Sequence, residues 1–563
     1  MPARFFFSER GPEDALTAPA HAYLPPALEH GRAWGFGLNL YALRSKRNWG
    51  IGDFTDLREF VHLAVRSGAD VVGVNPLHAL HYVEPDAASP YSPTSRYFLN
   101  PLYIDVEGVP EFFDPAPKAQ ALRERVASEP FAHTLATLRA AGEVAYGRIA
   151  RAKYSALAEL YAVFRERRGH RREAFRAYAA ARGERLERFA IYEALTERFA
   201  RDDGRERGWL TWPLDFQHPD ADAVREFAVK SRRRIDYFKY LQWLADDQLA
   251  SVAETARALS IGLYRDVAVG VDVNSADVWS DQGAYILEET VGAPPDPLGP
   301  NGQNWGLPPL DPARMLDDGG AAFAELLAAN MAHAGALRLD HAMALLRLFR
   351  IPRGKSAAEG TYVAYPFEQL LAIATNESLR ARCTIVGEDL GTVPDGFRDR
   401  MAREAIFSYR LLLFERGADG RFISPAAYPE YALATATTHD LPTLPGWSIG
   451  RDIDARSRIG LIFEDGAADA HATRRVDVSL LLEALLEHGA LDRDGFEALH
   501  RTIDARVPDA AAYDPLTRAA YRYLALSPAR LVLVQLDDAT GEFEQVNLPG
   551  TFVEYPNWRR KSR

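Results

Sequence analysis

The stretch Ala336-Leu-Arg-Leu-Asp340-His341 is a short apolar run that ends abruptly at a carboxylate. Two further stretches have the same form, Thr384-Ile-Val-Gly-Glu388-Asp389-Leu-Gly391 and Ala434-Thr-Ala-Thr-Thr-His439-Asp440. A buried parallel strand has this pattern where it emerges at its carboxyl end. In a (β/α)8 barrel, active sites are built at that end from side chains of several strands. The three stretches therefore predict an α/β fold of the TIM-barrel type, with Asp340, Glu388 and Asp440 at one end of the barrel.

Candidate strands occur at eight places along the chain. The first two, at 34–41 and 69–75, are separated by a glycine-punctuated loop and a helix near residues 56–67. This is a β-α-β unit with a short crossover, which is typical of a parallel sheet. The eight candidates lie near residues 36, 72, 266, 337, 386, 410, 436 and 533. That is the number of strands that a (β/α)8 barrel requires.

The rest of the chain is expected to form a lead-in before the barrel and insertions between its strands. Residues 1–33 are irregular and rich in Pro and Ala, so we expect a lead-in, with the catalytic barrel at 34–563. A mainly helical insertion is expected at about 107–260, where charge-laced amphipathic stretches are typical of solvated helix faces. The segment at about 277–312 is rich in Pro and Gly and is expected to have little regular structure. Because so long a connection inside a compact domain is usually functional, we expect a lid there.

The composition excludes several classes of protein. The chain has 563 residues, with 78 acidic and 66 basic residues and a net charge of −12, which argues against a nucleic-acid or anionic-membrane partner. No apolar stretch is long enough to span a membrane, and residues 1–8 lack a signal-peptide core, so we expect a cytoplasmic protein. The single cysteine, Cys383, excludes an internal disulfide and a zinc-binding cysteine cluster. The oligomeric state stays open.

The carboxylates fit a retaining glycosyl transfer, which needs a nucleophile and an acid/base about 5–5.5 Å apart. Asp340 suits the nucleophile, because Arg338 lies two residues earlier on the same face of the strand and keeps an aspartate ionised. Glu388 suits the acid/base, because the adjacent Asp389 and the other carboxylates of the site are expected to raise its pKa. His439 and Asp440 are placed to bond the hydroxyls of a sugar ring.

An alternative explanation exists for each of these residues. An Asp or Glu at a strand end is commonly a helix N-cap or a surface charge. The combination favours a site, because an arginine precedes one carboxylate and a histidine precedes another. The 28 Phe, 24 Tyr and 9 Trp are mostly core residues, but aromatic rings beside carboxylates also suit a sugar-binding groove.

Longer motifs add a family resemblance. Trp49-Gly-Ile-Gly-Asp53 and Gly302-Gln-Asn-Trp-Gly306 are the most specific of them. The chain resembles the 4-α-glucanotransferases of glycoside hydrolase family 77, the amylomaltase or disproportionating enzymes of the α-amylase clan. The resemblance runs almost end to end, through segments 40–53, 89–91, 100–105, 294–296, 302–308, 338–341, 387–391, 438–440, 547–551 and 555–558.

The resemblance implies roles that agree with those argued from the residues. Asp340 matches the nucleophile of the family, Glu388 its acid/base and Asp440 its third carboxylate. The substrate-binding residues expected from the motifs are Arg338, His439, Tyr91, Ser89, His341, Asp389, Asp296, Gln303, Asn304 and Trp305. Tyr91 alone is equally compatible with a packed loop tyrosine, and Trp305 with an anchor that packs its loop.

The activity implied is transfer of α-1,4-glucan segments between maltodextrins, or to glucose, by a double displacement with retention. It implies no organic cofactor, and no calcium-type loop or other metal site is expected. The resemblance also implies that segment 277–312 arches over the cleft and excludes water. A hydrolase of the same clan and a catalytically silent glucan-binding protein are the two rivals.

The chain departs from the family pattern at two places. Asn274 stands where some relatives carry Asp, with Asp272 two residues earlier as the expected substitute. Asp296-Pro-Leu-Gly299 stands where some relatives carry adjacent aromatic residues at the tip of the lid. The preferred glucan length and the formation of cyclic products are therefore left open.

Overall fold

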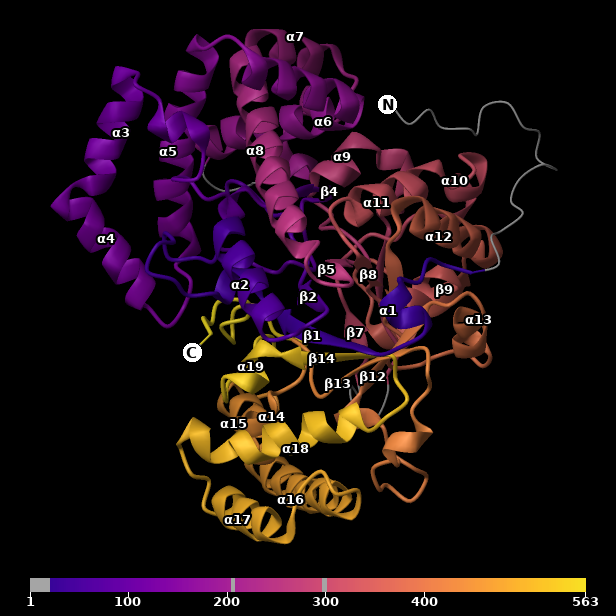
Figure 1. Ribbon diagram of the computed structural model, residues 1–563. Helices are drawn as coiled ribbons and strands as arrows, with labels where there is room; N and C mark the ends of the chain where they lie inside the picture. The colour runs from indigo at the N-terminus through magenta and orange to yellow at the C-terminus, as the bar shows by residue number, and fades with distance from the viewer. Residues whose placement is uncertain (1–20, 204–207, 296–300, 563) are drawn as a thin grey trace.

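The computed structural model describes residues 21–203, 208–295 and 301–562. In these residues, eight parallel strands close into a barrel in the order β1-β14-β13-β12-β11-β8-β5-β2 (Figure 1). The strands are β1 (Ala33–Leu38), β2 (Val71–Val74), β5 (Gly262–Val267), β8 (Ala336–Leu339), β11 (Thr384–Gly387), β12 (Phe407–Leu411), β13 (Ala432–Thr435) and β14 (Leu531–Gln535). They coincide with the eight candidates, so the predicted fold class is confirmed.

The barrel has a packed interior. One hydrophobic cluster draws buried residues from all eight strands, among them Ala33, Val71, Tyr264, Ala336, Val386, Phe407, Leu433 and Leu531. Filled interiors of this kind are the rule in (β/α)8 barrels, where side chains stack in layers. The packing fixes the register of neighbouring strands, and with it the height at which each strand ends.

Helix α2 (Phe54–Arg66) connects β1 to β2 and begins with a strong cap. The Asp53 carboxylate accepts hydrogen bonds from the backbone N–H groups of Thr55 and Asp56, and Asp56 bonds back to the N–H of Asp53. This capping box satisfies donors that the first helical turn leaves free. Arg47 forms ion pairs with Asp53, Asp56 and Asp105, so it also ties the preceding loop to the start of the helix.

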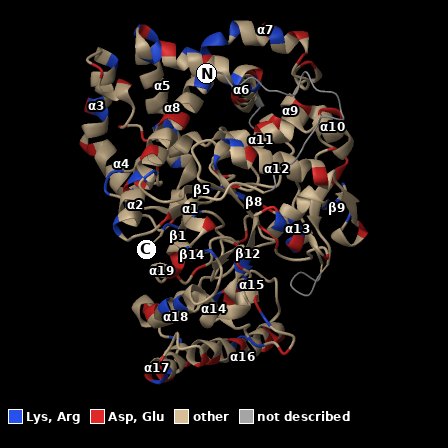
Figure 2. Ribbon diagram, turned by 45° about the vertical axis from the view of Figure 1, so that its right-hand side comes forward, with Lys and Arg blue, Asp and Glu red and all other residues tan. Residues whose placement is uncertain are grey.

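In the described residues between β2 and β5, six α-helices form a block at the upper left and top of Figure 1. They are α3 (Pro117–Ala127), α4 (Glu129–Ala140), α5 (Tyr146–Glu166), α6 (His170–Asp203), α7 (Asp222–Lys230) and α8 (Arg232–Ala256). Phe164 packs against Tyr240 and Trp243, with ring centroids 4.8 and 5.5 Å apart. Figure 2 shows basic and acidic residues interspersed along these helices, as expected for helices with solvated faces.

The segment expected to have little regular structure contains several elements, so that expectation was wrong for its described part. It holds α9 (Ala276–Ser280), β6 (Glu289–Ala293) and β7 (Gln303–Asn304). Strand β6 pairs antiparallel with β7 and with β9 (Arg347–Pro352), which pairs with β10 (Thr361–Ala364). The pairing of β6 with β9 joins distant segments, and the burial of β9 does not alternate, so no two-residue period in the sequence revealed these strands.

No helix in the described part of the chain is long and apolar enough to cross a membrane.

The remaining α-helices and strands lie around the barrel and between its strands along the chain. The other helices and strands are α1 (Pro26–Glu29), β3 (His78–Ala79), β4 (Ser95–Leu99), α10 (Pro312–Asp317), α11 (Ala321–Met331), α12 (Phe367–Ala381), α13 (Phe397–Arg403), α14 (Leu444–Ser448), α15 (Arg451–Arg458), α16 (Glu464–Glu487), α17 (Arg493–Asp504), α18 (Asp514–Ala525) and α19 (Leu536–Ala539).

The start of β8 gives a test of the barrel packing. A Cβ added at Gly335 would lie 1.6 Å from the carbonyl oxygen of Ile261, so Gly335→Ala forces β8 away from its neighbour. We expect the free energy of unfolding to fall by about 1–3 kcal/mol, as for other overpacked core positions. Urea unfolding followed by circular dichroism measures this change.

The matched control is Gly466→Ala in α16, where an added Cβ meets nothing within 4 Å. Alanine is favoured over glycine in a helix by about 1 kcal/mol, so this variant is expected to be at least as stable as the wild type. Equal stability of the Gly335→Ala variant and the wild type would contradict the close approach at the start of β8.

Candidate active site

The register of three neighbouring strands brings Asp340 and Glu388 to the same end of the barrel. Leu339, the last residue of β8, lies opposite Val267 on β5 and Gly387 on β11. The N–H of Asp340 donates to the carbonyl of Val267 (3.1 Å), and the N–H of Glu388 donates to that of Leu339 (3.0 Å). The two carboxylates therefore emerge side by side at the carboxyl end of the sheet.

A buried ion cluster holds Asp340. One guanidinium nitrogen of Arg338 lies 2.9 Å from Oδ1 of Asp340 and 2.9 Å from both carboxylate oxygens of Asp266. Burial alone would lower the pKa of Arg338, but Asp266 and Asp340 raise it well above its ordinary value. Arg338 therefore stays charged and orients Asp340. Asp266, on β5, was missed by the sequence analysis.

Glu388 has a different environment, made mainly of backbone N–H groups. Its Oε2 accepts a hydrogen bond from the N–H of His341, and its Oε1 from the N–H of Leu390, both at 2.8 Å. Burial, followed by the charge of Asp340, raises the pKa of Glu388 to about 7, against the opposing effect of Arg338 and the two N–H groups. The carboxyl group is therefore suited to hold a proton near neutral pH.

Asp389 does not act on Glu388 in the way the sequence analysis expected. Its carboxylate accepts hydrogen bonds from Ser408 Oγ (2.5 Å), from the N–H of Tyr409 (2.9 Å) and from Arg398 (2.9 Å). These contacts tie β11 to β12 and α13, and the residue is 3% exposed. The raised pKa of Glu388 has burial as its main cause, which corrects the role predicted for Asp389.

Tyr91 joins the cluster from the long loop after β2. Its hydroxyl donates to Oδ2 of Asp266 (2.6 Å), and its ring stacks on the imidazole of His439 at 4.6 Å between centroids. Burial and the charge of Asp266 raise the pKa of Tyr91 well above its ordinary value, so the phenol stays a donor. Ser89 is half-buried behind it, where its Oγ accepts the N–H of Tyr91 at 3.4 Å.

Asp440 lies at the open side of the cluster, with a half-exposed side chain (49%). His439 Nε2 lies 3.2 Å from its Oδ2, and the side-chain amide of Asn547 donates to its Oδ1 at 2.6 Å. Partial burial raises the pKa of Asp440, but His439 and Asn547 outweigh it and the pKa lies below its usual range. Asp440 therefore stays ionised. Asn547 begins the motif at 547–551, but the motif alone predicted no role for it.

The segment between α9 and α10 reaches the cluster through Trp305. The Trp305 ring lies edge-on to the imidazole of His341, with centroids 5.2 Å apart. Its Nε1 donates to the exposed side chain of Gln303 (3.0 Å), and the exposed Asn304 caps the N–H of Gly306 (2.9 Å). Burial lowers the pKa of His341 to about 4, so this imidazole is neutral at pH 7.

Asp296, the remaining substrate-binding candidate, lies outside the described residues. The departure from the family at Asn274 falls in a tight turn after β5, where Asp272 Oδ1 accepts the N–H of Asn274 at 2.7 Å. Asp272 also lies 3.4 Å from the hydroxyl of Ser92, the residue after Tyr91. Asp272 is therefore linked to the Tyr91 loop.

An apolar cavity of about 80 Å³ lies beside Asp340 and His341, under the segment that carries Trp305. Its lining includes Val267, Val269, Pro308, Leu310, Leu345 and Tyr365. The wall of the site beside Asp340 is therefore mostly apolar.

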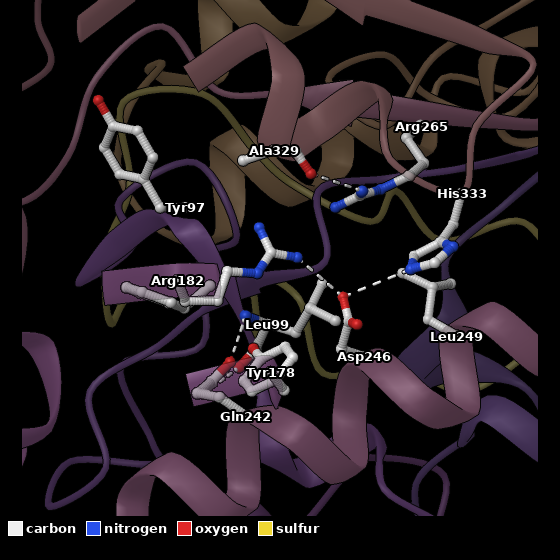
Figure 3. Close-up of a pocket in the computed structure, with 11 residues that line it drawn as sticks. Tyr97, Leu99, Tyr178, Arg182, Gln242, Asp246, Leu249, Arg265, Ala329 and His333 are labelled. Atoms are coloured by element: carbon white, nitrogen blue, oxygen red, sulfur yellow. Dashed lines mark hydrogen bonds and ion pairs between the residues drawn. The ribbon is translucent and has the colours of Figure 1, made fainter. Parts of the chain in front are cut away.

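A second pocket, polar and of only about 10 Å³, is made by other residues (Figure 3). There Asp246 pairs with Arg182 (3.1 Å) and His333 (3.4 Å). These polar groups pair with one another, so we assign that pocket a structural role. Across residues 21–203, 208–295 and 301–562, no group of three or more His, Cys, Asp or Glu side chains is arranged to hold a metal ion.

A closed parallel barrel with an aspartate, a glutamate and a second aspartate at its carboxyl end is an enzyme scaffold suited to reactions at glycosidic bonds. The family model described as 4-alpha-glucanotransferase, glycoside hydrolase family 77, matches residues 38–563, and the chain belongs to this family. The family resemblance predicted from the motifs is therefore confirmed, and the protein is an enzyme.

Named relatives agree with this assignment. The chain is similar to the 4-alpha-glucanotransferase of Haemophilus influenzae, with 39% identity over 97% of this chain and 78% of the relative. It is 37% identical to that of Mycobacterium tuberculosis, over 97% of this chain and 73% of the relative. Among solved structures, the amylomaltase from Corynebacterium glutamicum matches with a TM-score of 0.81 and 31% identity, over 95% of this chain and 72% of that one.

Asp266 provides a test of the ion cluster. Asp266→Asn keeps the shape of the side chain but removes one of the two negative partners of Arg338. Arg338 and Asp340 then lose their fixed geometry, and we expect kcat/KM for glucan transfer to fall about 100-fold, as for other small displacements of reacting groups.

The matched control is Asp399→Asn at an exposed position of α13, which is expected to leave kcat/KM unchanged. Circular dichroism and the thermal unfolding midpoint of both variants show whether each folds. A folded Asp266→Asn enzyme with wild-type kcat/KM would show that Arg338 needs no second carboxylate.

Proposed function

We propose that the protein transfers α-1,4-glucan segments between maltodextrins, or to glucose, through a covalent glycosyl-enzyme on Asp340. The observation that carries this proposal is the contrast between two neighbouring carboxyl groups. Asp340 is paired with the buried cation of Arg338, while Glu388 is bonded to backbone N–H groups and has a pKa of about 7. Two carboxyl groups in unlike environments are the pattern of a nucleophile and an acid/base.

The proposed reaction proceeds in two displacements. In the first, Asp340 attacks the anomeric carbon while Glu388 gives its proton to the glycosidic oxygen, so that the leaving sugar departs with that proton. In the second, Glu388 removes the proton from the 4-hydroxyl of an acceptor sugar, which attacks the anomeric carbon and releases Asp340. Two inversions give net retention.

Further residues are assigned to the donor sugar. Asp440 and His439 are proposed to bond its hydroxyls, contacts that tighten as the oxocarbenium-like state forms. Tyr91 is proposed to border the ring, and its fixed orientation on Asp266 supports this role. Gln303, Asn304 and Trp305 are proposed as glucan contacts of the lid; the first two are exposed and Trp305 touches His341.

Transfer in place of hydrolysis requires that water be kept from the glycosyl-enzyme. This part of the proposal is supported by Trp305 over His341 and by the apolar cavity beside Asp340. It separates the proposed function from that of a hydrolase using the same three carboxylates. A silent glucan-binding protein has no use for a paired nucleophile and a protonated acid.

Incubation with maltotriose, with products separated by chain length over time, tests the proposed function. We expect released glucose and a ladder of longer maltodextrins. Asp340→Asn is expected to reduce turnover about 10⁴-fold or more, as for other lost nucleophiles, while maltotriose binding persists. Glucose and maltose without longer chains would mean a hydrolase, and a fully active Asp340→Asn enzyme would overturn the assignment of the nucleophile.

The pKa of Glu388 predicts the alkaline limb of the pH profile. Because Glu388 must be protonated for the first displacement, kcat/KM is expected to fall tenfold per pH unit above an apparent pKa near 7. Initial rates on maltotriose between pH 5 and 9 measure this limb. A profile that stays flat to pH 9 would contradict the assignment.

The same pKa predicts a pH dependence of stability. The folded-state pKa of Glu388, about 7, lies above the value of roughly 4.3 expected in the unfolded chain. The folded state thus binds the extra proton, and the contribution of Glu388 to stability is lost as the pH rises through this interval. Wild-type stability relative to Glu388→Gln should therefore fall between about pH 4 and 7, as measured by urea unfolding.

A further inference from the structure

The loop that carries His439 and Asp440 is held by residues from the end of the chain. The N–H of Asn547 donates to the carbonyl of His439 (3.1 Å), and its side-chain amide donates to Oδ1 of Asp440 (2.6 Å). Nε2 of Gln545 donates to the carbonyls of Asp440 (2.9 Å) and Asn547 (2.6 Å). Both the backbone and the carboxylate of Asp440 are therefore fixed from one side.

Trp558 packs against the rings of Tyr91 and His439. Its ring lies 5.5 Å from that of Tyr91 and 5.3 Å from that of His439, so it packs against the stacked pair. The residue is only 4% exposed, which leaves little of its surface for a sugar. Trp558 therefore reaches the reaction through Tyr91 and His439.

The backbone of Trp558 adopts a left-handed conformation, with φ at +60°. Such a conformation is uncommon for a bulky residue and persists where the surroundings fix it. Here the N–H of Trp558 donates to the carbonyl of Val546 (3.1 Å), and its carbonyl accepts the buried hydroxyl of Tyr146 in α5 (2.7 Å). The bend directs the indole back toward the barrel, while the chain continues toward the helices.

The residues after Trp558 anchor it on those helices. The carbonyl of Arg559 accepts the N–H of Val144 (2.7 Å), and the N–H of Lys561 donates to the carbonyl of Gly142 (3.0 Å). The Lys561 ammonium donates to the carbonyl of Leu138, the end of α4, at 2.6 Å. Figure 1 shows this end of the chain beside α2 and α4. Trp558 is thus fixed on both sides.

We propose that Gln545, Asn547 and Trp558, here called the C-terminal clamp, position the donor site: Asn547 fixes Asp440, and Trp558 fixes the stacked Tyr91–His439 pair. This proposal rests on the proposed function, because it assigns the clamp to the sugar contacts of that reaction. Contacts of His439 and Asp440 that tighten in the transition state depend on the clamp more than ground-state binding does. Its loss therefore acts on kcat more than on KM.

Four variants test the clamp: Trp558→Leu, Trp558→Phe, Asn547→Ala and Trp243→Leu. Trp243 is the matched control, because it is equally buried (6%) but packs in the helical block against Phe164 and Tyr240. Initial rates on maltotriose give kcat and KM, and the thermal unfolding midpoint gives the stability of each variant. Rates are expressed per folded molecule.

For Trp558→Leu we expect kcat to fall about tenfold, the worth of one or two lost aromatic contacts, with KM within about twofold. Trp558→Phe keeps a ring and is expected to recover most of the rate. Asn547→Ala is expected to lower kcat and to move the acidic limb of the pH profile upward, because Asp440 loses a donor that lowers its pKa. Trp243→Leu is expected to lower the unfolding midpoint and leave kcat unchanged.

The clamp is overturned if Trp558→Leu keeps the wild-type kcat, or if Trp243→Leu loses as much, since the rate would then follow stability. Both outcomes leave the maltotriose ladder of the wild type intact, so they separate failure of the clamp from failure of the proposed function. If the wild type makes no ladder, the proposed function fails. The clamp then fails with it, because it assigns its residues to the sugar contacts of that reaction.

Discussion

The site depends on one buried cation, the guanidinium of Arg338, which is bonded to Asp266 on one side and Asp340 on the other. Burying an ion is expensive, and only close, well-directed partners repay that cost. Those partners come from β5 and from the residue after β8, so the pairing is possible only when both strands end at the same height. The packed interior of the barrel fixes that height. The core thereby sets the positions of Asp266 and Asp340 around Arg338.

The position of Arg338 also explains why the two carboxyl groups differ. Its direct ion pairs go to Asp266 and Asp340, whereas the hydrogen bonds of Glu388 come from the N–H groups of His341 and Leu390. His341 has a left-handed backbone (φ +48°) at this position. Its imidazole has a pKa lowered to about 4 by burial, so it adds no second cation beside Glu388. A carboxyl group with a raised pKa can thus lie next to a carboxylate that is paired with a cation.

Local patterns in the sequence predicted the strands and the residues that terminate them. Asp340, Glu388 and Asp440 follow apolar runs, so their position at the barrel end could be inferred. Asp266 could not, because it lies inside an apolar run beside Arg265, and two adjacent charges in a buried strand were its only signal. The pairing of β6 with β9 and the packing of Trp558 on Tyr91 are non-local, and no local period encodes them. The orientation of Asp389 depends on Ser408 and Tyr409 of the neighbouring strand, which the Glu-Asp pair alone does not reveal.

Closure of the barrel brings segments from distant parts of the chain together at the site. Because β1 pairs with β14, the first and last strands are neighbours, and segments from both ends of the chain meet at one side. Tyr91 comes from the loop after β2, whereas Asn547 and Trp558 come after β14, and all of them converge on His439 and Asp440 after β13. The contacts of Tyr91 with His439 and Trp558 join segments far apart in the chain, so a large loop-closure entropy opposes them. His439 and Asp440 are therefore held by segments far from them in the chain, whereas Asp340 and Glu388 follow the adjacent strands β8 and β11. In this fold, His439 and Asp440 depend on contacts with the loop of Tyr91 and with the segment after β14, and Asp340 and Glu388 depend on strands from the middle of the sequence.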